Sequence, residues 1–280
     1  QDELEEAGDD RCAAVEELPL QTVGMLALIW TCVLRDLRAT TPYVTAFKFS
    51  VIGIGIFAWL FRRPIANEAA MMGPNVPLEE LMMVKLQTFL TFGILFDFMM
   101  KFKADGYRRD KIVMWHWCYY EWTRMRRVPL LLLATHCVDA AFVVVNASLF
   151  TVWIRWTTGR SMDAWPTFWW ILNVGLFMQV VLWCNRCAWM MMDRTDVRQA
   201  FLGTLTFVVL GFNDILIRKD AIEPSIAWLV DINPLYYLDR TLNHDAHAST
   251  LALIVALLMA MLATAASTWR YTSTLETSAS

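Results

Sequence analysis

The stretch VPLLLLATHCVDAAFVVVNASLFTVW, residues 128–153, decides the fold class of this chain. It is longer than the roughly 20 apolar residues that a helix needs to cross a bilayer core of about 30 Å. Asp139 is its single formally charged residue. The stretch therefore predicts a membrane-spanning helix.

Five further blocks of similar character lie on either side of this stretch. Together the six blocks cover residues 44–61, 81–100, 128–153, 165–192, 200–217 and 250–269. Charged residues make up 18% of the chain, against about a quarter in an average soluble domain, and the mean hydropathy is +0.41. The expected fold class is an all-α polytopic membrane protein with six transmembrane helices.

The two ends of the chain differ from the blocks. Residues 1–17 form an acidic N-terminal tail and residues 272–280 a polar C-terminal tail, so the transmembrane domain is expected over residues 18–271. The apolar run between Gln21 and Arg35 is too short for a comfortable span and predicts an interfacial amphipathic helix over residues 18–36. The chain begins with Gln1 instead of Met, which fits a removed targeting segment or a trimmed chain.

Lys and Arg are distributed unevenly between the loops. Thirteen lie on the side that holds residues 101–127, against seven on the other side. By the positive-inside rule, both termini and residues 101–127 are expected to face the cytosol or its organellar equivalent. The expected locations are an organellar membrane, such as the mitochondrial inner membrane, or the plasma membrane, with membrane lipids as partners.

Composition and motifs argue against several functions. The net charge of −3 argues against a nucleic-acid partner. The sequence shows no nucleophile–base constellation that would indicate an enzyme. The sequence WCNRC, residues 183–187, has a Cys-x-x-C spacing but lies inside an apolar block, where buried or lipid-facing cysteines are the better interpretation. A polar outer loop explains His244 and His247, so the sequence predicts no metal site and no cofactor.

A basic and aromatic segment follows the second block. From Gly106 to Arg127 nothing breaks a helix, and Trp and Tyr are interleaved with charge, which predicts an amphipathic helix at the membrane surface. This helix would anchor the chain to lipid headgroups or dock a soluble partner. The candidate docking residues are Arg108, Arg109, Lys111, Glu121, Arg124, Arg126 and Arg127.

The charged residues inside the blocks include Lys48, whose long side chain can reach the membrane surface, and the candidate intramembrane charges Asp97, Asp139 and Arg186. Such charges mark a functional site or a structural ion pair between helices, and the second interpretation is preferred here. Because an unpaired arginine is costly at membrane depth, Arg186 is expected to contact a carboxylate, Asp97 first and Asp139 second. Phe89, Phe92 and Phe96 recur at helical spacing, where they line a pathway or pack against a neighbouring helix.

The order of these elements resembles the membrane domain of ABC-2 type permeases, particularly the G subfamily of ABC transporters. RDLRATTPYVTAFKFSVIGIGIFAWLF, residues 35–61, is similar to the family's entry into its first span. FLGTLTFVVLGFNDILIRKDAIEPSIAWLVDINPLYYLDRTLNH, residues 201–244, is similar to a fifth span followed by a re-entrant element before the last span. The residues that carry this second match are Gly211, Pro224, Trp228, Asn233, Pro234, Tyr236 and Tyr237.

The resemblance implies that residues 18–36 form a connecting helix and residues 106–127 a cytosolic coupling helix. In the family a proline begins the helix that contains the Trp, and prolines commonly begin helices. An aromatic face on the second span, here the three phenylalanines, lines the substrate cavity in the family. The implied function is a transport permease half that forms a dimer and works with ATPase chains.

Two departures from the family keep a second function open. The chain has no Gly-x-x-x-x-Gly-Lys-Ser/Thr loop, and residues 1–17 are too few for an ATPase domain, so an ATPase would be a separate chain. The coupling segment reads YYEWTRMRR, residues 119–127, instead of an Arg-Glu-Arg pattern. These departures favour an accessory or structural subunit of a larger, organellar membrane complex and predict that no ATPase contacts residues 106–127. The re-entrant motif favours a permease.

Overall fold

The computed structural model describes residues 128–157, 162–192, 194–214, 217, 219–243 and 246–279, and the single positions 30, 34, 52, 53 and 56. Every regular element over these residues is a helix, so the expected all-α fold class is confirmed there. The second expected span and the basic segment lie outside the described residues, as does nearly all of the first expected span and of the expected interfacial helix.

Six α-helices and one short 3-10 helix, η2, follow one another along the described part. They are α6 (Val128–Thr157), α7 (Ala164–Met191), α8 (Thr195–Gly211), η2 (Lys219–Ala221), α9 (Trp228–Asp231), α10 (Pro234–Asn243) and α11 (Ala246–Ala279). By length and composition, three segments can cross a membrane: His136–Trp156, Ala164–Met191 and Ser249–Tyr271. They coincide with the third, fourth and sixth expected blocks, and the chain is an integral membrane protein.

The fifth block, residues 200–217, was predicted with the wrong bounds. Helix α8 contains 17 residues and ends at Gly211, so it covers about 26 Å at 1.5 Å per residue. Beyond it, the side-chain amide of Asn213 donates to the carbonyl of Leu210 at 2.9 Å, and Asp214 adopts a φ of 63°. Such local side-chain bonds and left-handed backbone end a helix even where the sequence stays apolar.

Arg155 is one of the seven Lys and Arg residues expected in loops of the outer side, but it lies in the last turn of α6, which continues to Thr157. Its side chain is buried, with the guanidinium carbon 5.3 Å from the centre of the Trp170 ring. A guanidinium placed over an indole is attracted by the ring's electron density. Contact with α7 therefore extends α6 beyond the apolar block.

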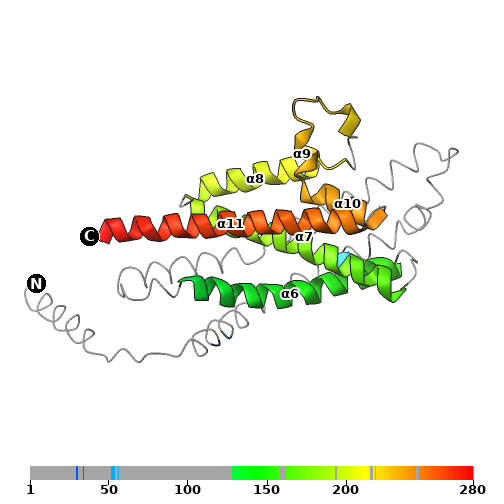
Figure 1. Cartoon of the computed structure of the whole chain (residues 1–280), viewed down its shortest axis with the longest axis horizontal. Coiled ribbons are helices and arrows are strands. Elements are labelled where there is room, and N and C mark those ends of the chain that lie inside the picture. Colours follow the sequence, from blue (N-terminus) through cyan, green and yellow to red (C-terminus); the bar gives the residue numbers. More distant parts are fainter. Residues whose placement is uncertain are drawn as a thin grey trace, which may run out of the picture.

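Helix α7 lies at the centre of the described part and contacts α6, α8, α10 and α11. Figure 1 shows α7 between α6 on one side and α8 on the other, with α11 crossing it. Thr250 of α11 contacts Asn173 and Thr264 contacts Trp183, so α11 runs parallel to α7. Helix α6 runs antiparallel to α7.

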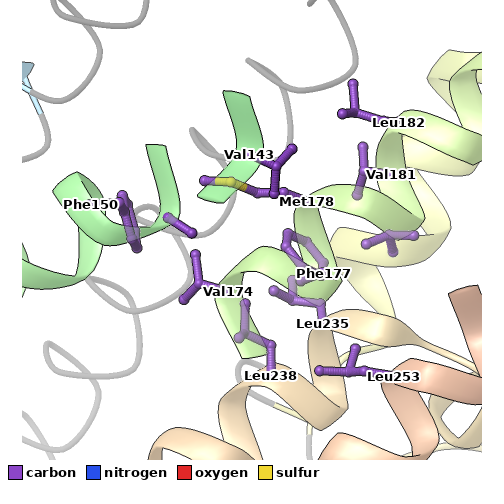
Figure 2. Packing of buried hydrophobic residues seen from close by; sticks show 12 residues of the cluster. Val143, Phe150, Val174, Phe177, Met178, Val181, Leu182, Leu235, Leu238 and Leu253 are labelled. Carbon is purple, nitrogen blue, oxygen red and sulfur yellow. The ribbon is translucent and has the colours of Figure 1, made fainter. Parts of the chain in front are cut away.

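The buried apolar side chains gather around α7, as Figure 2 shows. Phe177 and Met178 of α7 are fully buried, and Leu235 of α10 and Leu253 of α11 pack in the same cluster. Where α6 crosses, α7 presents Gly175, whose added Cβ would lie 3.7 Å from the Cβ of Ala147. Small residues at such crossings let membrane helices approach closely, because lipid offers little hydrophobic drive for association.

Candidate functional site

The described residues include only part of the candidate site. The coupling residues Arg108, Arg109, Lys111, Glu121, Arg124, Arg126 and Arg127, the aromatic set Phe89, Phe92 and Phe96, and Asp97 all lie outside them. The re-entrant motif lies within them, as do Asp139 and Arg186. These two groups form the candidate functional site described below.

The re-entrant motif forms a bent connection between α8 and α10. Gly211 is the last residue of α8, and Pro234 is the first residue of α10. Pro224 does not begin a helix as the resemblance implied. It follows Glu223, whose carbonyl accepts the backbone N–H groups of Ile226 and Ala227 at 3.0 and 3.1 Å. A turn therefore comes first, and the short helix α9 begins only at Trp228.

Asn233 joins the two ends of this connection. Its side-chain Nδ2 donates to the carbonyls of Val209 at 2.8 Å and Phe212 at 2.6 Å. Its Oδ1 accepts the backbone N–H of Leu235 at 2.9 Å. The residue is 3% exposed. One amide thus caps the first turn of α10 and satisfies carbonyls at the end of α8 that no helical N–H can reach.

Sequence reasoning placed Asn233 in the motif without giving it a role. An Asn before a Pro is a common helix start, so the capping contact with Leu235 had a local signal. The contacts of Asn233 with α8 had no local sequence signal, because Val209 and Phe212 are distant from it in sequence. Only the folded arrangement brings these carbonyls to the asparagine.

Charged and aromatic side chains fasten the more exposed side of the connection. Asp231 accepts a hydrogen bond from the ammonium group of Lys219, and its backbone carbonyl accepts the hydroxyl of Tyr237 at 2.6 Å. The backbone N–H of Lys219 donates to the carboxylate of Asp214. Arg240 donates to the hydroxyl of Tyr236 at 3.0 Å. Asp231 therefore links η2, α9 and α10.

The surroundings of this cluster shift two pKa values. The hydrogen bond with Asp231 raises the pKa of the Lys219 ammonium group. Burial raises the pKa of the Tyr237 hydroxyl. Because both free side chains already titrate near pH 10, lysine stays charged and tyrosine stays a donor throughout the neutral range.

A buried ion pair joins α6 to α7 deeper in the molecule. Arg186 donates from Nη2 to Oδ2 of Asp139 at 3.2 Å, and the two side chains are 2% and 4% exposed. The guanidinium carbon of Arg186 lies 5.0 Å from the centre of the Trp183 ring. Asp139 is the second of the two carboxylates expected for Arg186, and the first, Asp97, lies outside the described residues.

Two hydroxyl contacts between α7 and α11 had not been predicted. Thr250 donates to Oδ1 of Asn173 at 2.9 Å, and Thr264 donates to the backbone carbonyl of Trp183 at 3.0 Å. A threonine in an apolar block gives little sequence signal, since its hydroxyl can also bond to its own helix. These contacts hold the two parallel spans in register.

Over the described residues, the site consists of hydrogen-bonded clamps and ion pairs, and no group of three or more His, Cys, Asp or Glu side chains there could hold a metal ion. The family model described as ABC-2 type transporter matches residues 24–244. The matched range contains both the re-entrant connection and the Asp139–Arg186 pair. No curated protein matches the chain.

Proposed function

The chain belongs to the ABC-2 type transporter family, and from this premise we propose that it is one permease half of a membrane transporter. It would pair with a second permease half, because six spans form only half of a pathway, and separate ATPase chains would dock on residues 106–127. Transport would proceed by alternating access between two conformations. In this function the chain itself carries out no bond chemistry.

The observation that carries this proposal is the connection held by Asn233. Backbone that leaves the helical path at membrane depth is tolerated where protein covers it or where it lines a cavity. The carbonyls of Val209 and Phe212 receive such cover from Asn233. This cover allows the re-entrant connection before the last span to keep its shape, as we expect of a permease.

The buried ion pair supports the same proposal at a second place. Arg186 and Asp139 join neighbouring spans, and their side chains are almost completely buried between the helices. We assign them the structural task of holding α6 and α7 as one body. Alternating access requires such bodies, since movement between rigid groups of helices exposes the pathway to each side in turn.

A second candidate function rests on the coupling segment YYEWTRMRR. Its departure from the family pattern supports an accessory or structural subunit of a larger membrane complex, with other membrane subunits in place of ATPase chains. In that function residues 106–127 would be covered by a subunit without a phosphate loop.

Purification of the full chain from its native membrane in mild detergent tests both functions. For the permease, we expect an ATPase with a phosphate loop to co-purify, to crosslink to residues 106–127 and to hydrolyse ATP. Replacing Arg124, Arg126 and Arg127 by Glu should release it. The control replaces Arg62 and Arg63 by Glu. These two arginines belong to the seven Lys and Arg residues expected on the opposite side, so the ATPase should stay bound.

One result would end the permease proposal. Residues 106–127 would crosslink only to membrane subunits without a phosphate loop, and the purified complex would hydrolyse no ATP. The accessory-subunit function would then stand. A bound and active ATPase that depends on the three arginines would exclude the accessory function instead.

A further inference from the structure

We propose that Asn233 is a positioning residue that fastens the outer end of α8 to α10, so that the two helices move together. The part of this inference that concerns movement rests on the proposed permease function. The fastening itself rests only on the contacts of one side chain with Val209, Phe212 and Leu235.

The chemistry of the contact explains why asparagine stands at this position. The side-chain amide has two donor hydrogens and an acceptor oxygen. The two donors reach carbonyls of α8 and its cap, and the oxygen reaches the first turn of α10. Aspartate would keep the acceptor but has no donor when ionised, and serine would be too short to reach α8.

Helix α10 is in turn anchored to the centre of the molecule. Leu235 and Leu238 are fully buried and belong to the same apolar cluster as Phe177 of α7 and Leu253 of α11. Figure 2 shows both leucines pointing into this cluster. A displacement of the outer end of α8 must therefore carry α10 with it or break the contacts of Asn233.

The other contacts across the connection lie nearer the surface. The ion pair between Lys219 and Asp231 is partly exposed, and water competes for such pairs. Asn233, in contrast, is buried, and a buried donor or acceptor that loses its partner carries the full cost of desolvation. The polar part of the fastening therefore depends mainly on the asparagine, while Val209 of α8 belongs to the same buried apolar cluster as Leu235 of α10.

Hydrogen exchange of the full chain in lipid nanodiscs tests the fastening. In Asn233→Asp, we expect backbone amides over residues 208–214 to exchange about tenfold faster than in the wild type, because a lost bond lets the helix end open. The first turn of α10 should keep its protection, since the aspartate still accepts from Leu235. Asn233→Ala should lose protection at both places.

Two further variants keep the test decisive. Asn233→Ser removes the contacts with α8 without adding a charge. This variant serves as the test if Asn233→Asp does not fold. Tyr237→Phe is the matched control, because it removes a partly exposed hydroxyl contact in the same connection. Unchanged exchange over residues 208–214 in both Asn233→Asp and Asn233→Ser would overturn the inference.

The joint movement is tested in the complex with its ATPase chains, with ATP and vanadate as the probe. In the wild type, protection over residues 208–214 and over α10 should change together when the nucleotide is trapped. In Asn233→Asp, the change should be confined to one of the two segments. If both segments still respond together, joint movement through Asn233 is refuted. If no ATPase is bound, the permease function fails, whereas the exchange result in nanodiscs still decides the fastening.

Discussion

At the scale of single residues, Arg186 and Asp139 bring two opposite charges together between membrane-spanning helices. Removing charges from water carries a large desolvation cost, which mutual attraction and good hydrogen-bond geometry offset only in part. The indole of Trp183 lies beside the guanidinium and adds a cation–π contact. The pair therefore specifies which faces of α6 and α7 meet more than it adds to stability.

Breaking this pair on one side should be costly. We expect Arg186→Met to lower the free energy of unfolding by about 3–5 kcal/mol, because it leaves the buried carboxylate of Asp139 without its arginine. The double variant Arg186→Met with Asp139→Leu should recover most of this loss, since apolar side chains tolerate the same environment. Unfolding equilibria in bicelles, measured for both variants, check this expectation.

The control for this prediction is an arginine on the same side of the molecule. Arg194 pairs with Asp196 at 2.9 Å, but the two side chains are 78% and 65% exposed. Arg194→Met should change the free energy of unfolding by less than about 1 kcal/mol. A double variant as unstable as Arg186→Met alone would contradict the assignment of the buried pair.

Raising the pH into the alkaline range should break the contacts of Asp231 with Lys219 and Tyr237. Both pKa values are raised in the folded protein. Each contact therefore contributes fully below the pKa of the free side chain, about 10 for both residues, and is lost as the pH rises through the folded value. The tyrosinate absorbance of the wild type minus that of Tyr237→Phe should show a transition above pH of about 10. A transition below that pH would contradict it.

At the scale of elements, the crossing of α6 and α7 depends on a missing side chain. The Cβ added at Gly175 would lie 3.7 Å from Ala147 and 3.8 Å from Val143, which is ordinary contact distance. The crossing therefore accepts one methyl group and has no room for a longer side chain. Close packing of the two helices, and with it the approach of Arg186 to Asp139, therefore requires a small residue at position 175.

The substitutions Gly175→Ala and Gly175→Leu should consequently change the free energy of unfolding by different amounts or in opposite directions. The alanine should change the free energy of unfolding by no more than about 1 kcal/mol, because its methyl group makes ordinary contacts and alanine has a higher helix propensity than glycine. The leucine should destabilise by about 1–3 kcal/mol through overpacking. Gly203→Leu is the control, since nothing lies within 4 Å of a Cβ added there. Equal losses at Gly175 and Gly203 in a thermal unfolding assay would refute this account.

At the scale of the whole molecule, the directions of the helices fix which loops share a side. Helices α7 and α11 are parallel and α6 is antiparallel to them, so the end of α6 and the connection before α10 lie on one side. The turn between α7 and α8 and the C-terminal end of α11 lie on the other side. That second side holds Arg194, Arg198 and Arg270 and is expected to be the inner one.

Labelling with an impermeant maleimide in oriented membranes tests this arrangement. In a background without the native cysteines, Glu223→Cys and Asp196→Cys should react from opposite sides, because Asp196 lies in the first turn of α8 and Glu223 in the connection beyond its opposite end. Native Cys118, retained alone, should react from the same side as Asp196→Cys. Labelling of all three cysteines from one side would contradict the helix directions. Labelling of Cys118 from the same side as Glu223→Cys would contradict the expected orientation of the basic segment.

The fold class and the approximate position of the three candidate spans could be predicted from the amino-acid sequence alone. Apolar length and charge are sums over neighbouring residues, so residues 128–153, 165–192 and 250–269 predict helices whatever they later contact. Pro234 likewise marks a helix start through its own fixed backbone angle. The family resemblance could be recognised from the sequence for the same reason, since it rests on the order of elements and one local motif.

Only the tertiary structure decided which groups meet. Arg186 required a carboxylate by its charge, but the register of α6 against α7 brought it to Asp139. The fastening of α8 by Asn233 depends on the carbonyls of Val209 and Phe212, which lie far from the asparagine in sequence. Hydropathy is a property of a segment, whereas a hydrogen bond depends on the distance and angle between two atoms, and packing of the helices alone sets these.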